Sequence, residues 1–167
     1  MTNEPLVLGV DPGLGTTGYG VLHLRRGSPR LLEAGVIRCD RKKTLEQRLL
    51  ELHGGIQEVL HAHPGIQAMA MEQIYSHYDR PRTAILMGHA RGVLCLAASQ
   101  SSLAVYSYLP TRVKKALTGN GRAPKSQVQY AVQQQLGLST VPEPPDVADA
   151  LAVALCHYFA LRNALVG

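Results

Sequence analysis

Two acidic residues of this sequence stand at the ends of apolar runs of strand type. Asp11 follows the run from Leu6 to Val10, and Glu72 ends the run that starts at Ala68. The Pro-Gly pair after Asp11 cannot continue a β-ladder, so the chain must turn with the carboxylate at the strand end. A carboxylate in such a position costs free energy unless a positive group meets it, and a divalent metal ion is a common partner. The alternatives are that Asp11 caps the turn as a hydrogen-bond acceptor and that Glu72 is a solvated carboxylate.

Two more carboxylates are predicted in the first turn of a C-terminal helix. Asp146 and Asp149 follow a run of prolines and are three residues apart, which places them on one helix face. Acids in a first turn are also favoured by the helix dipole, by about 0.3 to 1 kcal/mol, so N-capping alone is the alternative. Residues 150–155 are apolar on all sides, however, and a helix buried on most sides cannot turn its first acids freely to water. We therefore expect both acids to need a partner.

Four clustered carboxylates would repel one another strongly when ionised. Two magnesium ions roughly 3.5 to 4 Å apart would resolve that repulsion, position a water for attack on a phosphodiester and stabilise the leaving oxygen. The four acids therefore predict metal-dependent phosphodiester hydrolysis.

Hydrophobic periodicity and turn residues predict an α/β chain with five strands, of which the first three form an antiparallel meander. A helix between two strands normally makes a right-handed parallel crossover, so strands four and five should lie parallel, and we expect strand four beside strand one. Asp11 and Glu72 would then face one crevice at the carboxyl ends of strands, where open α/β sheets bind ligands. The predicted strands are 6–10, 17–24, 31–38, 68–72 and 103–108, and the predicted helices are 45–61, 83–99, 111–117, 125–136 and 146–164.

Length and composition predict one globular domain. The chain has 167 residues, 46% of them hydrophobic, which is enough for one substantial core and too few for two generous domains. No apolar run approaches the roughly 20 residues that cross a bilayer, and residues 1–5 lack the features of a secretory signal, so a cytoplasmic protein is expected. Three cysteines without paired spacing are expected to be reduced thiols. A net charge of +5 and a pI of about 9.3 favour a polyanionic partner.

Five motifs follow one another over nearly the whole chain. They are residues 9–13 (GVDPG) with 17–20 (TGYG), 71–75 (MEQIY), 88–93 (GHARGV), 125–128 (KSQV) and 146–152 (DVADALA). In this order they resemble the RuvC family of bacterial Holliday junction resolvases. The resemblance implies a ribonuclease-H-like fold, with a five-stranded mixed sheet flanked by helices, and a homodimer that nicks two opposed strands of a four-way DNA junction.

The resemblance also implies roles for the four acids. The acidic quartet of the family falls on Asp11, Glu72, Asp146 and Asp149, as ligands of two Mg²⁺ ions for which Mn²⁺ is expected to substitute. A branch-migration helicase complex is implied as a further partner.

The densest basic run of the chain predicts where DNA phosphates bind. It lies between Leu109 and Gln135 and contains no acid, and side chains of this kind would give affinity with a steep salt dependence. The alternative is a solvated helix face. The resemblance places the lysines matching Lys114 and Lys125 near the scissile strand. The run comprises Arg112, Lys114, Lys115, Arg122 and Lys125.

The loop after Glu72 carries a second set of candidates for DNA binding. Tyr75 resembles the family aromatic that approaches the junction, and a ring there could stack on an unpaired base for about 1 to 3 kcal/mol. The residues alone, without the resemblance, favour a position at the edge of the core for Tyr75. Arg80 and Arg82 could grip phosphates, although Asp79 dilutes the positive charge.

The helix predicted from residue 83 carries small residues on one face. Gly88 and Gly92, four apart and near Leu86, would let another helix approach closely. The family resemblance places the dimer contact on this helix, and packing against the sheet of the same chain is the alternative. Two-fold symmetry would suit a junction with two symmetry-related cut strands.

Three other functions share part of this pattern. The first strand and turn also resemble the phosphate-binding hairpin of actin-like ATPases and sugar kinases, but the chain lacks room for their second domain. A non-catalytic DNA-binding module would not need all four acids. A different nuclease of the ribonuclease-H-like superfamily would share the metal chemistry and differ in substrate.

Overall fold

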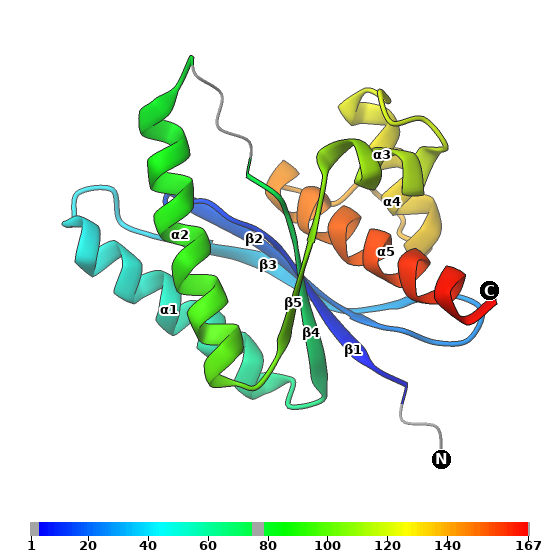
Figure 1. Ribbon diagram of the computed structural model, residues 1–167, viewed down its shortest axis with the longest axis horizontal. Helices are drawn as coiled ribbons and strands as arrows, with labels where there is room; N and C mark the ends of the chain where they lie inside the picture. The colour runs from blue at the N-terminus through cyan, green and yellow to red at the C-terminus, as the bar shows by residue number, and fades with distance from the viewer. Residues whose placement is uncertain (1–3, 75–78, 167) are drawn as a thin grey trace.

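The computed structural model describes residues 4–74 and 79–166 (Figure 1). Five strands and five helices follow one another in the predicted order. They are β1 (Leu6–Asp11), β2 (Thr16–His23), β3 (Arg30–Arg38), α1 (Leu45–Ala62), β4 (Ile66–Glu72), α2 (Pro81–Gln100), β5 (Ala104–Tyr108), α3 (Pro110–Thr118), α4 (Lys125–Leu136) and α5 (Pro145–Val166).

The strands form one mixed sheet in the order β3-β2-β1-β4-β5. Strands β1, β2 and β3 are antiparallel neighbours, whereas β4 runs parallel to both β1 and β5. This arrangement confirms the predicted meander and the predicted parallel placement of strand four beside strand one. The carboxyl ends of β1, β4 and β5 therefore meet at the same edge of the sheet.

Helices cover both faces of the sheet (Figure 1). One face packs against α1 and α2 through a core that includes Leu8, Met69 and Leu94. The other face packs against α5, which crosses the sheet and is itself covered by α3 and α4, through a core that includes Leu22 and Leu151. Helix α5 thus lies between the sheet on one side and helices α3 and α4 on the other, and this explains why its middle is apolar all round.

Local sequence explains where the helices begin and end. The backbone N–H of Thr44 donates to Oε1 of Gln47 at 3.2 Å, as in a capping box at the start of α1. Helices α2 and α3 begin at Pro81 and Pro110, earlier than predicted, because proline suits a first helical position that needs no N–H partner. Gly137 adopts a φ of 62° and ends α4.

None of the helices within residues 4–74 and 79–166 has the length and apolar character needed to cross a bilayer.

Candidate active site

Asp11 and Glu72 leave neighbouring strands at the same end of the sheet. Val10 of β1 pairs with Met71 of β4, so the residue after each of them carries an acid at the sheet edge. Both side chains are half-buried. The predicted juxtaposition of these two acids is therefore present.

The turn after Asp11 is closed by a different side chain. The Oγ1 of Thr17 donates to the carbonyl of Gly13 at 2.6 Å and accepts from the N–H of Gly13 at 3.2 Å. Thr17 is fully buried, and no side-chain hydrogen bond of Asp11 is found within the described part of the chain. Thr17 supplies the turn cap, so the Asp11 carboxylate is not needed for that task.

Glycines in β1 and β2 let α5 rest directly on the sheet backbone. Gly18 pairs with Asp11 across the two strands, and a Cβ at Gly18 would lie 2.0 Å from the carbonyl oxygen of Asp146. A Cβ at Gly9 would lie 2.1 Å from the carbonyl oxygen of Ala150. No other residue type fits at either position without displacing backbone. The glycines therefore bring the first turn of α5, with its two acids, against the strand pair that carries Asp11.

The first turn of α5 is anchored by the residues that follow it. Residues 150–155 are all buried, with exposed fractions of 2% or less. Asp146 and Asp149 are half-buried at the end of this apolar segment, as the sequence predicted.

The electrostatics show that the four acids act on one another. Burial, followed by the negative charges of Asp149, Asp146 and Glu72, raises the pKa of Asp11 from about 4 to about 8. Burial and the charge of Asp149 also raise the pKa of Glu72. The four side chains therefore share one site in which negative charge outweighs the positive charge nearby.

Two lysines of the basic run face this site. The Nζ of Lys125 donates to Oδ2 of Asp149 at 3.1 Å. Burial lowers the pKa of Lys125, but the hydrogen bond to Asp149 and the nearby carboxylates outweigh burial and raise it. Lys114, like Lys125, opposes the rise in the pKa of Glu72. These two lysines belong to the acid cluster as well as to the basic surface.

Arg112 and Lys115 of the basic run lie on another side of α3. Arg112 and Lys115 line a cavity of about 420 Å³ between α3 and α5, on the side of α3 that contains Ala116. The guanidinium of Arg112 lies 5.1 Å from the centre of the Tyr108 ring. Arg122 is exposed in the turn before α4. The single basic run therefore divides into a part that faces the acids and a part that does not.

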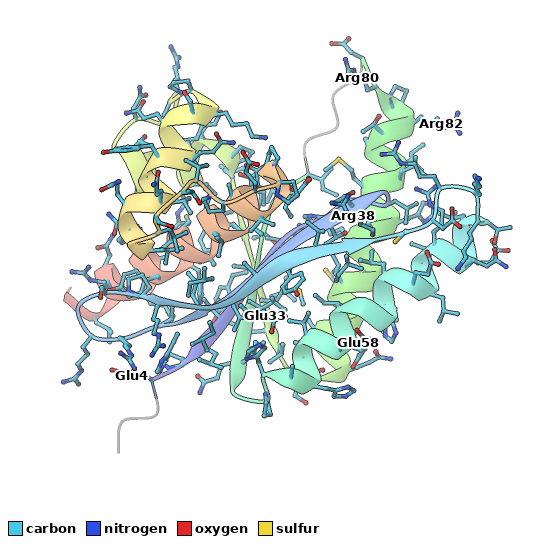
Figure 2. The ribbon with its side chains drawn as sticks, turned by 180° about the vertical axis from the view of Figure 1, so that it is seen from behind. Glu4, Glu33, Arg38, Glu58, Arg80 and Arg82 are labelled. Atoms are coloured by element: carbon cyan, nitrogen blue, oxygen red, sulfur yellow. The ribbon has the colours of Figure 1, made fainter. Side chains whose placement is uncertain are left out.

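The second set of DNA-binding candidates lies at the N-terminal end of α2. Arg80 and Arg82 are exposed there (Figure 2). Tyr75 lies outside the described residues. Both arginines lie at the same end of the molecule as the acids, because α2 begins at the end of the sheet where β4 ends (Figure 1).

Arg91 is a site residue that the sequence did not predict. Its Nη1 donates to the backbone oxygen of Glu72 at 2.6 Å, and its Nη2 donates to Oγ of Ser107 at 2.5 Å. An arginine on a helix carries no signal of such contacts, because they come from strands that are distant in sequence.

The exposed face of α2 contains the predicted small residues. Gly88 and Gly92 are exposed, and nothing lies within 4 Å of a Cβ built on either. Ile85 and Leu96 extend the same face, with exposed fractions of 62% and 54%. Leu86, in contrast, is half-buried and packs against the core of its own chain. The two glycines therefore do not serve packing against the chain's own sheet.

The four acids suit divalent cations because of the chemistry of their carboxylate oxygens, although the side chains are not arranged as a complete set of metal ligands. Carboxylate oxygens are the ligands that Mg²⁺ prefers, and the repulsion that raises the pKa of Asp11 is what a cation would relieve. Across residues 4–74 and 79–166, no three side chains of His, Cys, Asp or Glu are placed closely enough to hold one ion as they stand.

Comparison with known proteins identifies the family. A family model described as crossover junction endodeoxyribonuclease RuvC matches residues 7–157. The chain belongs to the RuvC family. Its relative from Rhodopirellula baltica, a crossover junction endodeoxyribonuclease RuvC, is 59% identical over 159 residues, which cover 94% of this chain and 88% of the relative.

Solved structures of the family agree with this assignment. The structure of Thermus thermophilus RuvC is 35% identical and superposes with a TM-score of 0.88, covering 95% of this chain and 96% of that one. The same organism's RuvC in complex with a Holliday junction substrate gives a TM-score of 0.87 at 35% identity, covering 96% of both chains. The predicted ribonuclease-H-like fold and nuclease family are confirmed, and the ATPase or sugar-kinase alternative is excluded.

Proposed function

We propose that this chain resolves four-way DNA junctions by metal-dependent nicking of two opposed strands. The observation that carries the proposal is the coupling of Asp11 to Asp149, Asp146 and Glu72 at one edge of the sheet. Membership of a family of crossover junction endodeoxyribonucleases supports the substrate. We include in the proposal that residues 1–167 form one nuclease domain, since all five strands join one sheet.

The four acids are proposed as the ligands of two Mg²⁺ ions, with Mn²⁺ able to substitute. Bound divalent ions supply Lewis acidity and lower the pKa of an attacking water. Asp11 must lose its proton to serve as a ligand, so binding releases a proton when the pH lies below about 8. Attack by water on phosphorus then breaks the bond to the 3′ oxygen, leaving a 5′-phosphate and a 3′-hydroxyl.

Lys114 and Lys125 are proposed to act at the scissile strand. Their positive charges face the acids and would meet the phosphate that approaches the site. Lys115, Arg122, Arg80 and Arg82 are proposed to contact phosphates further away, with Tyr75 stacking on a base near the junction. These contacts give binding that weakens steeply as salt rises.

A homodimer would place two such sites on one junction. We propose that the exposed face of α2, formed by Ile85, Gly88, Gly92 and Leu96, makes the contact, with Leu86 at its edge. Two-fold symmetry of the protein would then match the two opposed strands. A branch-migration helicase complex and a cytoplasmic location complete the proposal.

Selective cleavage tests this function. A synthetic four-way junction and a linear duplex that contains the same sequences are each incubated with Mg²⁺, with Mn²⁺ and with a chelator. The proposal predicts nicks in the junction alone, with either metal, that the chelator abolishes. Equal cutting of the duplex would indicate a less selective nuclease, and tight junction binding without cutting under either metal would indicate a binding module.

A further inference from the structure

Arg91 joins helix α2 to the ends of two neighbouring strands. Its guanidinium reaches the carbonyl oxygen of Glu72 on β4 at 2.6 Å and the hydroxyl of Ser107 on β5 at 2.5 Å. Met71, the residue before Glu72, pairs with Ser107 in the parallel ladder. The two acceptors therefore lie on adjacent strands, and one forked side chain spans both.

The contact falls where the sheet ends. Glu72 is the last residue of β4, and the N–H of the next residue, Gln73, makes a bond of 2.8 Å to the carbonyl of Tyr108. The pairing of β4 ends at this point, and the next element in the chain is α2, which begins at Pro81. The ladder holds Glu72 from one side only, so the direction of its carboxylate depends on what fixes the backbone at this last position.

Arg91 meets neutral acceptors rather than the carboxylate. Its two hydrogen bonds go to a backbone carbonyl and a hydroxyl, whereas the cations that act on the Glu72 side chain are Lys114 and Lys125. A guanidinium that only balanced charge would not need this placement. Two charge-assisted bonds, one to the Glu72 carbonyl itself and one to the neighbouring strand, orient the backbone that carries the acid.

We propose that Arg91 is a positioning residue that holds the end of β4 against α2 and β5, so that the Glu72 carboxylate points into the acid cluster. This inference rests on the proposed nuclease function. It assigns to the middle of α2 a task inside the active site, in addition to the surface that the same helix exposes. Removing such an outer contact to a metal-ligand residue typically costs about 10- to 100-fold in metal affinity or activity.

The test measures junction cleavage as a function of Mg²⁺ concentration, with the protein in excess over the junction. The variants are Arg91→Ala, Arg91→Lys, Ser107→Ala and the double variant Arg91→Ala with Ser107→Ala. Arg30→Ala is the control, because Arg30 is exposed at the opposite end of the sheet, where it pairs with His23. Junction binding in chelator and the thermal unfolding midpoint are recorded for each protein.

We expect Arg91→Ala to cut about 10- to 100-fold more slowly and to need more Mg²⁺ for half-maximal rate, with junction binding unchanged. Arg91→Lys should recover part of the rate, and the double variant should be no slower than Arg91→Ala, because both changes break one network. A normal rate with an unchanged Mg²⁺ requirement in Arg91→Ala would overturn the inference. The inference would also be overturned if Arg91→Ala lost enough thermal stability to explain its slower cleavage and Arg91→Lys lost as much. If the Arg30→Ala and unaltered proteins also fail to cut, the proposed function fails instead.

Discussion

The ammonium of Lys125, at the first residue of α4, lies 3.1 Å from the carboxylate of Asp149 in the first turn of α5. The pair is partly exposed, with 61% of the Lys125 side chain and 34% of the Asp149 side chain accessible, so its direct contribution to stability is small. The pair matters because of its position in the site. It puts a positive charge that DNA can reach beside an acid that is expected to bind metal.

The division of the basic run predicts two different kinds of defect. Lys125→Gln should slow cleavage of bound junction by at least about 10-fold, because it removes a charge beside the reacting phosphate. Lys115→Gln should leave that rate unchanged and weaken binding, lowering the salt slope of log K by about 0.9. Single-turnover cleavage and binding titrations at several salt concentrations measure the two effects.

Lys114 and Lys115 provide a matched pair for this prediction, because they are adjacent in sequence and face different surroundings. If Lys114→Gln and Lys115→Gln had the same effect on rate and on binding, the division of the run would be wrong.

The raised pKa of Asp11 predicts a pH-dependent effect on stability. With a folded pKa of about 8 against an ordinary value of 3.8, the folded protein binds a proton that the unfolded chain has already released. The stability from this group is complete below pH 4 and is lost as the pH rises toward 8. Asp11→Asn removes that loss, so in chelator it should be more stable than the unaltered protein, by at least about 1 kcal/mol at pH 8 and by less at pH 5.

Chemical denaturation at the two pH values measures this difference. Mg²⁺ should stabilise the unaltered protein more at pH 8 than at pH 5 and should stabilise Asp11→Asn far less, since binding needs the ionised acid. An Asp11→Asn variant that is less stable than the unaltered protein at pH 8 in chelator would contradict the electrostatic account.

The contact between Gly18 and Asp146 predicts a strong effect of a single methyl group. Gly18→Ala would place a Cβ 2.0 Å from the carbonyl oxygen of Asp146, so backbone must move. We expect a loss of about 1 to 3 kcal/mol in the free energy of unfolding, together with loss of cleavage, because the first turn of α5 is displaced from Asp11.

Gly54→Ala is the control for this change. Gly54 is exposed in α1 with nothing within 4 Å of a Cβ, so alanine should stabilise the helix by about 0.5 to 1 kcal/mol and leave cleavage intact. Denaturation midpoints and cleavage rates of both variants decide the matter. A fully active and stable Gly18→Ala protein would show that α5 does not rest on β2 as described.

The exposed face of α2 predicts the surface of the proposed dimer. Leu96→Asp puts a charge on the face that includes Gly88 and Gly92, and it should halve the mass measured by sedimentation equilibrium at micromolar concentration. Leu50→Asp, at a more exposed leucine on α1, should leave the mass unchanged. If the Leu50→Asp dimer dissociated and the Leu96→Asp dimer did not, the interface would lie elsewhere on the protein.

Much of this architecture is visible in the sequence because it follows from local patterns. Alternating apolar residues, the Pro-Gly turn after Asp11 and the crossover rule together predict the strand order and the meeting of Asp11 with Glu72. The roles of Gly9 and Gly18 were not predicted, because a glycine in a strand indicates a close contact without indicating which element makes it. Arg91 was missed for a related reason, since its partners come from two other elements.

The basic run shows a second feature of the site that the sequence pattern alone did not predict. Charge and density mark it as one surface, yet Lys114 and Lys115 project from different sides of one helix. A helical reading of the spacing separates the two side chains, but only the packing of α3 on α5 shows which of them meets the acids.

The most direct test of the central claim is the product formed from a supercoiled plasmid that extrudes a cruciform, which is a four-way junction. Two coordinated nicks on opposed strands within one binding event convert the plasmid to a linear molecule, whereas separate single nicks release the supercoils and leave a nicked circle. We predict linear DNA as the first product in Mg²⁺, none in chelator, and none from the Asp11→Asn protein. Nicked circles without linear product, or linear product from Asp11→Asn, would contradict a symmetric resolvase built on these four acids.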